Sequence, residues 1–290
     1  YLSVRLNAHV ANFGIGNFGL DQALLLAEKE VPHYQPDVVV MGVVPETIAR
    51  CRGRWKHYFE YGNTLAFKPS FRLTDSGLEA VDSPVRKRED FQLSDRDLLE
   101  LEKTDYFFDR KFRNDILKFP YLISILRRLS RNAPIFWHLL TTHFMSEKSR
   151  QVGWRKAFEV ILRENAKETA ALYKEGGSTA LLAALIERFA KLCETHGSRP
   201  VLLIIPQPSD LSRKNGETPY REFFHTLESS IDVLDMTEAF STHKEPSLLY
   251  VGGALGPHCS VEGNRLIADA LNNLICAFPS GSKYSHCGTE

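Results

Sequence analysis

Two stretches at opposite ends of the chain hold residues that could do chemistry. Near the carboxyl end, His258 stands in a polar loop two residues before a predicted helix. A histidine within reach of a hydroxyl can act as its general base. Near the amino end, the glycine-rich turn Gly14–Gly19 precedes another helix, where backbone N–H groups suit a developing negative charge. His258 could equally be a surface histidine beside an ordinary helix start, so both interpretations stay open at this point.

The helix after His258 has clear sequence signals. Ser260 is a favourable N-cap, because its hydroxyl can accept a hydrogen bond from a free backbone N–H of the first turn. Gly263 is unusual so early in a helix and indicates close packing or a tight bend. An apolar face at helical spacing follows, made of Leu266, Ile267, Ala270 and Leu271. We expect this helix to pack on a sheet and to hold His258 at the rim of that sheet.

The elements that must position these residues follow an α/β pattern. The unbroken apolar runs 37–44 and 200–205 predict strands buried on both faces, and 231–235 predicts a third, shorter strand. A short strand is also expected at Val10–Phe13, directly before the glycine turn. Helices are predicted at 20–29, 154–174, 179–195 and 219–229. Strand, turn, helix and strand in this order predict a parallel sheet with helices packed on it.

The middle of the chain has a different character. Two short β-like runs around Thr74–Gly77 predict a hairpin, and residues 106–145 are rich in aromatic and basic residues and predict two or three short helices. We therefore interpret residues 51–151 as an insertion on the rim of one domain that spans 1–290, serving as a lid or a partner surface. The tail 278–290 is expected to be disordered.

Composition excludes some classes of function. Lys plus Arg and Asp plus Glu both number 36, so the net charge of zero gives no electrostatic case for nucleic acid. No apolar run is long enough to span a membrane. The five cysteines are scattered without metal-ligand spacing, so we predict no metal site, mostly reduced thiols and a reducing compartment such as the cytoplasm.

The glycine turn permits one interpretation by its letters alone. Gly14, Gly16 and Gly19 match the G-x-G-x-x-G fingerprint of dinucleotide-binding folds, and Glu46 near the end of the next strand could hold a ribose. Asn12 argues against this interpretation, since a polar residue stands where such a strand is normally apolar. We therefore expect no dinucleotide cofactor.

Three blocks together resemble the SGNH (GDSL-type) hydrolase superfamily. They are Asn12-x-Gly14 with Gly19-x-Asp21-Gln22, then Pro36–Val40, and finally the run from His258 through Ser260, Glu262 and Gly263 to Asn264. The resemblance implies a three-layer, flavodoxin-like α/β/α fold and the hydrolysis or transfer of acyl groups, with a small-molecule or glycan acyl ester as substrate. It implies that His258 is the histidine that activates the serine. The turn with Gly14, Gly16 and Asn17 would supply an oxyanion N–H, with Glu46 in the same pocket.

The chain also departs from the pattern of that superfamily. No Gly-Asp-Ser nucleophile motif occurs in it, and Leu255 stands where the acid of the triad is usual, three residues before the histidine. Asp235, near a strand end, is the candidate to orient His258 instead. We expect the nucleophile and the first strand of the sheet to lie outside these 290 residues. A non-catalytic relative that keeps the pocket for binding stays open as an alternative, and so does a nucleotide-binding protein.

Overall fold

The computed structural model describes residues 1–54, 67–91, 95–108, 110, 120–211, 218–252 and 258–278. The chain is an α/β protein that separates into two compact units. One unit joins Tyr1–Thr47 to Ala183–Glu290, and the other is Ile48–Leu182. The segment predicted as a rim insertion, 51–151, therefore belongs to a longer unit that also includes the following long helix.

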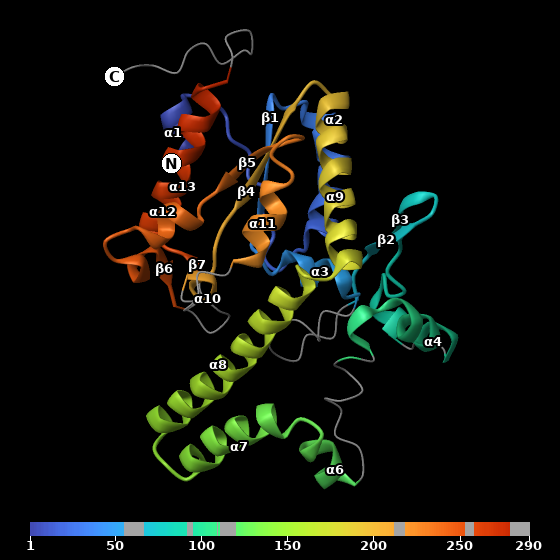
Figure 1. The fold of residues 1–290 in the computed structure, drawn as a ribbon, viewed down its shortest axis with the longest axis vertical. Coiled ribbons are helices and arrows are strands. Elements are labelled where there is room, and N and C mark those ends of the chain that lie inside the picture. The colour runs from blue at the N-terminus through green and yellow to red at the C-terminus, as the bar shows by residue number, and fades with distance from the viewer. Residues whose placement is uncertain are drawn as a thin grey trace. The chain divides into compact units, whose positions relative to one another are not determined.

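A parallel sheet of three strands organises the first unit (Figure 1). Its order is β1–β4–β5, and the strands are β1 (Val38–Val43), β4 (Arg199–Ile204) and β5 (Asp232–Asp235). All three lie where the apolar runs predict them, but β1 is not buried on both faces as expected, since Val38–Val40 are half-buried and Gly42 is exposed. In β4 every residue from Pro200 to Ile204 is buried, because helices cover both of its faces.

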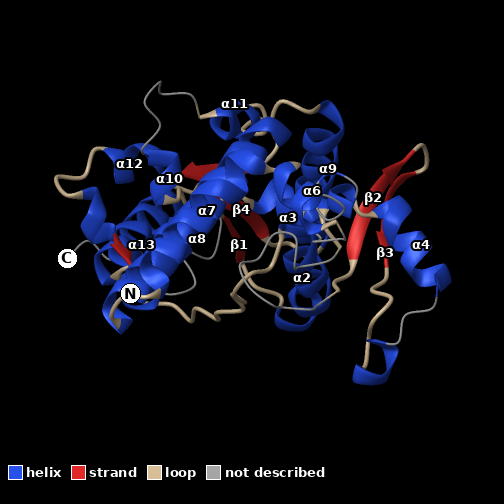
Figure 2. Ribbon diagram, turned by 90° about the horizontal axis from the view of Figure 1, so that it is seen from below, coloured by secondary structure: helices blue, strands red, loops and turns tan. Residues whose placement is uncertain are grey.

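The helices of this unit lie on the two faces of the sheet. One face packs against α13 (Val261–Cys276) and α1 (Leu2–Leu6) through a continuous apolar cluster: Val201, Leu203, Met236, Phe240, Leu249, Ile267, Leu271, Ile275 and Phe278. Along the other side lie α2 (Leu20–Tyr34) and α9 (Gly176–Thr195), joined by an ion pair of 2.6 Å between Arg188 and Glu28 (Figures 1 and 2). Short elements complete the unit: α10 (Pro208–Leu211), α11 (Pro219–His225), α12 (Thr237–Ser241), the 3₁₀ turn η4 (Pro246–Leu249), β6 (Tyr250–Val251) and β7 (His258–Cys259).

The strand predicted at Val10–Phe13 is wrong. These residues are exposed and belong to no strand of the described chain. The Asn12 side chain accepts a hydrogen bond from the backbone N–H of Gly14 at 2.9 Å, which bends the backbone into a turn. An exposed segment of this kind gains no burial to stabilise an extended conformation.

Two element boundaries also differ from the predictions. Helix α2 extends to Tyr34 and so includes Pro32 in its last turn, while α11 ends at His225, earlier than expected. Phe278, assigned to the disordered tail, is buried in the apolar cluster beneath the guanidinium of Arg199. The rest of that tail, 279–290, lies outside the described residues.

The second unit contains a β-hairpin and several helices. The predicted hairpin is confirmed as β2 (Ser70–Thr74) and β3 (Gly77–Val81), with Gly77 at a φ of 115° in the turn, a conformation that favours glycine. The hairpin lies beside α4 (Asp95–Thr104) in both views (Figures 1 and 2). The other elements are α3 (Thr47–Arg52), which begins in the first unit, a 3₁₀ turn at Arg88–Phe91, α6 (Tyr121–Leu126), α7 (Leu129–His143) and α8 (Glu147–Leu172).

A buried arginine ties the second unit together. The backbone N–H of Arg54 donates to Asp105, and the guanidinium donates to the Thr104 hydroxyl and to the carbonyl of Asp82, each at 2.7 Å. These bonds connect the end of α3, the end of β3 and the end of α4. Because a buried guanidinium without partners would be costly, the network fixes how these three elements pack.

Candidate functional site

His258 lies on a short hairpin at the rim of the parallel sheet. It is the first residue of β7 and is paired with Val251 of β6, and its side chain is exposed. The neighbouring Tyr250 donates its hydroxyl to the carbonyl of Pro206 at 2.8 Å. Because Pro206 follows the carboxyl end of β4, this bond holds the hairpin with His258 at the carboxyl edge of the sheet, the edge at which open α/β sheets bind ligands.

The start of α13 fixes the backbone beside His258 as the sequence predicts. The Ser260 hydroxyl accepts a hydrogen bond from the N–H of Gly263 at 3.1 Å and donates to the carbonyl of Leu248 at 2.6 Å. Gly263 is needed for close packing, since a Cβ built there would lie only 2.4 Å from the carbonyl oxygen of Leu249. The N-cap and the close approach are both confirmed.

The glycine turn at the other end of the chain leads to the same edge. Asn17 adopts a left-handed conformation with φ 65°, and Gly19 is the N-cap of α2. The next residue, Leu20, donates its backbone N–H to the Thr47 hydroxyl at 3.0 Å. Thr47 lies just beyond the carboxyl end of β1, so the start of α2 and the His258 hairpin share the carboxyl edge of one sheet (Figure 1).

The glycines of this turn are not held against other backbone. A Cβ at Gly16 would meet nothing within 4 Å, and one at Gly14 would meet only the Asn12 side chain. A dinucleotide fingerprint needs a strand directly before the first glycine, and that strand is not there. The geometry of the turn therefore does not favour the nucleotide interpretation.

The candidate acids lie at strand ends. Glu46 is half-buried just after β1. Asp235 ends β5, where one of its oxygens accepts from the backbone N–H of Thr237 at 2.8 Å and the other from Arg221 at 3.0 Å. Within the described chain no hydrogen bond joins Asp235 to His258, so that pairing stays a prediction. Leu255 lies outside the described residues.

The two residues that follow His258 do not present a nucleophile. The Ser260 hydroxyl is used as the helix cap, and burial raises the pKa of the Cys259 thiol, so the thiolate is disfavoured at neutral pH. Ser209 is an exposed hydroxyl in α10, close in sequence to the carboxyl end of β4. Ser209 is therefore the candidate nucleophile at this edge among the described residues.

Sequence reasoning missed the residues that hold the site to the sheet. Tyr250 and Thr47 each bridge segments that are far apart in the sequence, and Asp21 is completely buried in the first turn of α2. An acidic residue at a helix start is visible in the sequence, so Asp21 could have been found. Nothing in the sequence indicates the bonds of Tyr250 and Thr47. Both depend on where the chain returns to the sheet edge.

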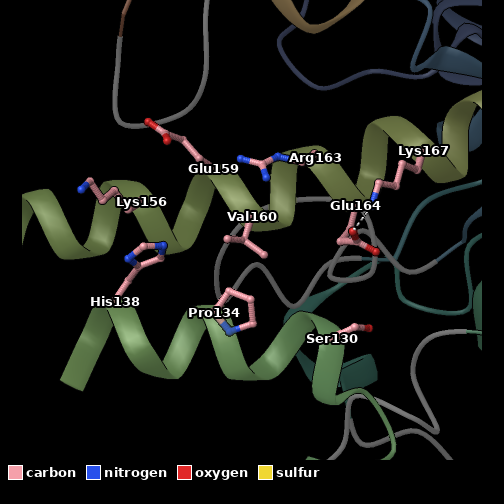
Figure 3. Close-up of a pocket in the computed structure, with 9 residues that line it drawn as sticks. All are labelled: Ser130, Pro134, His138, Lys156, Glu159, Val160, Arg163, Glu164 and Lys167. Atoms are coloured by element: carbon pink, nitrogen blue, oxygen red, sulfur yellow. Dashed lines mark hydrogen bonds and ion pairs between the residues drawn. The ribbon is translucent and has the colours of Figure 1, made fainter. Parts of the chain in front are cut away.

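Two cavities lie away from His258 and the glycine turn. A groove of about 370 Å³ runs between α7 and α8 and is lined by His138 and by several charged side chains, among them Lys156, Glu159 and Arg163 (Figure 3). A second, of about 500 Å³, lies at the amino edge of the sheet around Arg199 and Asp232. A pocket shared by His258 and the glycine turn therefore stays a prediction.

The cysteines and possible metal ligands complete the chemical inventory. Cys51, Cys193 and Cys259 are free thiols, as expected, whereas Cys276 is disulfide-bonded. Over the described ranges no group of three or more His, Cys, Asp or Glu side chains is placed to hold a metal ion.

Fold and site together define an α/β protein with a parallel sheet and an exposed histidine at its carboxyl edge. No family model, curated protein or solved structure matches the chain. The functional argument therefore depends on the residues and geometry of this chain alone.

Proposed function

We propose that this chain is the base-carrying part of an SGNH-type esterase or O-acyltransferase that works at the carboxyl edge of the parallel sheet. One observation carries the proposal. Two of the three blocks that carry the resemblance, the glycine turn and the His258 segment, are about 240 residues apart in the sequence. Both lie at that edge, one through the Leu20–Thr47 bond and the other through the Tyr250–Pro206 bond.

The topology of the sheet is compatible with a flavodoxin-like order. In the order 2-1-3-4-5 the last three strands are neighbours in the sheet and are added to it in sequence order, as β1, β4 and β5 are, with the hairpin β2–β3 lying outside this sheet. Among the described residues β1 pairs only with β4, so its other edge is available to a further parallel strand. Such a strand would satisfy the backbone groups along that edge and would carry the nucleophile to the rim near β1.

The chemistry that we propose is acyl transfer through a serine on a segment outside these 290 residues. His258 takes the proton of the serine hydroxyl as the serine oxygen bonds to the acyl carbon, and gives that proton to the alcohol oxygen as its bond to the acyl carbon breaks. Water, in an esterase, or a second alcohol, in a transferase, then takes the acyl group from the serine. Backbone N–H groups of the turn with Gly14, Gly16 and Asn17 would stabilise the negative carbonyl oxygen. Acyl esters of small molecules or glycans are the substrate class.

Hydrolysis of p-nitrophenyl acetate tests the proposal. Residues 1–290 should show no turnover beyond that of a His258→Ala variant. A chain that includes the coding sequence upstream of Tyr1, where this encodes a Gly-Asp-Ser motif, should be faster by orders of magnitude, and His258→Ala should abolish the gain. His196→Ala is the matched control, since His196 is also exposed but precedes the amino end of β4.

Two results would overturn the proposal. Hydrolysis by residues 1–290 that depends on His258 would mean that the nucleophile is already present, and Ser209→Ala would then be the first variant to examine. Equal rates for the extended chain with and without His258 would remove the histidine from the mechanism.

A further inference from the structure

Helix α7 presents an apolar stripe that nothing in the described chain covers. Its members recur at helical spacing and are Leu129, Ala133, Phe136, Trp137 and Leu140, with Phe144 at the C-cap. Trp137 is 66% exposed, Leu140 65% and Phe144 88%. An apolar stripe of this length on a surface helix marks a binding face, whereas single exposed apolar residues do not.

The opposite side of α7 is the one that packs within the unit. It lies against α8, where a Cβ at Gly153 would approach the Thr142 hydroxyl to 1.9 Å and the carbonyl of His138 to 2.7 Å. His138 and Pro134 point from α7 toward α8 (Figure 3). The side of α7 with His138 and Pro134 is thus packed on α8, while the apolar stripe on the opposite side stays exposed.

Charge identifies the kind of surface that fits the stripe. Residues 120–156 contain seven Lys and Arg but one acidic residue, Glu147, although the whole chain has a net charge of zero. These basic residues stand on both sides of the stripe in sequence: Arg127, Arg128 and Arg131 around the start of α7, and Lys148, Arg150, Arg155 and Lys156 after its end. Two of the three tryptophans, Trp137 and Trp154, are also here and exposed.

We propose that the α7–α8 hairpin docks on the surface of an anionic lipid bilayer, with the α7 stripe in the interface and the basic side chains on the lipid phosphates. Apolar helix faces rich in aromatic residues and flanked by Lys and Arg bind membranes in this in-plane manner. No described helix is long and apolar enough to cross a bilayer, so the hairpin would lie on the membrane. Pairing of two copies through the stripe would bring like charges together, which favours the lipid surface as the occupant.

Vesicle flotation tests this inference with the protein of 290 residues. We expect the protein to float with phosphatidylcholine vesicles that contain phosphatidylglycerol, and to stay in solution with phosphatidylcholine alone. The variant Trp137→Glu/Leu140→Glu should lose bound fraction by about tenfold or more. The matched control, Val4→Glu/Leu73→Glu, adds the same charge at exposed apolar positions on α1 and β2 and should bind like the parent.

A second variant and a second measurement keep the test decisive. Lys148→Glu/Arg155→Glu leaves the stripe intact and should weaken binding to anionic vesicles, as should high salt. Equal flotation of the parent and the Trp137→Glu/Leu140→Glu variant would overturn the inference. Failure of the parent protein to float with either kind of vesicle would also overturn it. If light scattering then showed a dimer that the Trp137→Glu/Leu140→Glu variant dissociates, a second copy of the chain would be what covers the stripe.

Discussion

Replacing glycine by alanine should have opposite effects at two helix starts, Gly263 of α13 and Gly177 of α9. At Gly263 the new Cβ would lie 2.4 Å from the carbonyl oxygen of Leu249, closer than the 3.0 Å that Cβ atoms essentially never cross. That oxygen also accepts the backbone N–H of Ser260 at 2.8 Å, so it cannot move without loosening the cap beside His258. At Gly177 nothing lies within 4 Å of the Cβ position.

The magnitudes follow from these surroundings. Overpacking against backbone should cost about 3 kcal/mol at Gly263. The better helix propensity of alanine offsets about 1 kcal/mol of this cost, so the free energy of unfolding should fall by about 2 kcal/mol. For a unit of this size that loss lowers Tm by about 4 to 8 °C. Gly177→Ala has no such cost and should raise the stability by up to about 1 kcal/mol.

Thermal and urea unfolding of both variants measure the difference. Loss of helical circular dichroism gives Tm, and the urea midpoint gives the free energy of unfolding when the slope is unchanged. A rise in stability for both variants, or equal losses, would refute the close approach between α13 and the Leu249 carbonyl. Gly16→Ala, at another open position, is a further control that should leave Tm nearly unchanged.

Three further predictions follow from single groups. Ser260→Ala removes both bonds of the cap and should lower the free energy of unfolding by about 1 kcal/mol in urea titrations, while Ser260→Thr should keep most of it. Burial raises the pKa of Cys193 to about 12 from an ordinary value of 9.0. The stability that this thiol contributes is therefore complete below pH 9 and is lost as pH rises toward 12. Cys193→Ala should flatten the alkaline fall in Tm, and an unchanged dependence of Tm on pH would contradict this. Calorimetry should detect no saturable binding of NAD or NADP, and binding that Gly16→Val abolishes would restore the nucleotide interpretation.

Much of the fold was predictable because local pattern and burial agree. The β-branched run at Val38–Val43 and the apolar run at Val201–Ile204 both predict strands, and both are strands. Only the second is buried throughout. The start of α13 was equally readable, since a serine cap and a glycine in the first turn are local signals with local causes. The α/β class follows from the alternation of these elements.

Only the tertiary structure decided how these elements meet. Val10–Phe13 has the composition of a short strand, but a strand needs a partner, and in the described chain this segment has turned around Asn12 instead. The partners of Asp235 are Arg221 and Thr237, which no spacing predicts. The spacing of apolar residues in α7 predicts an apolar face. That this face stays exposed follows from the tertiary structure, in which Gly153 of α8 packs against the opposite side of α7. Sequence periodicity thus determines which residues share a face, whereas contacts between distant segments determine which faces are buried and which are exposed.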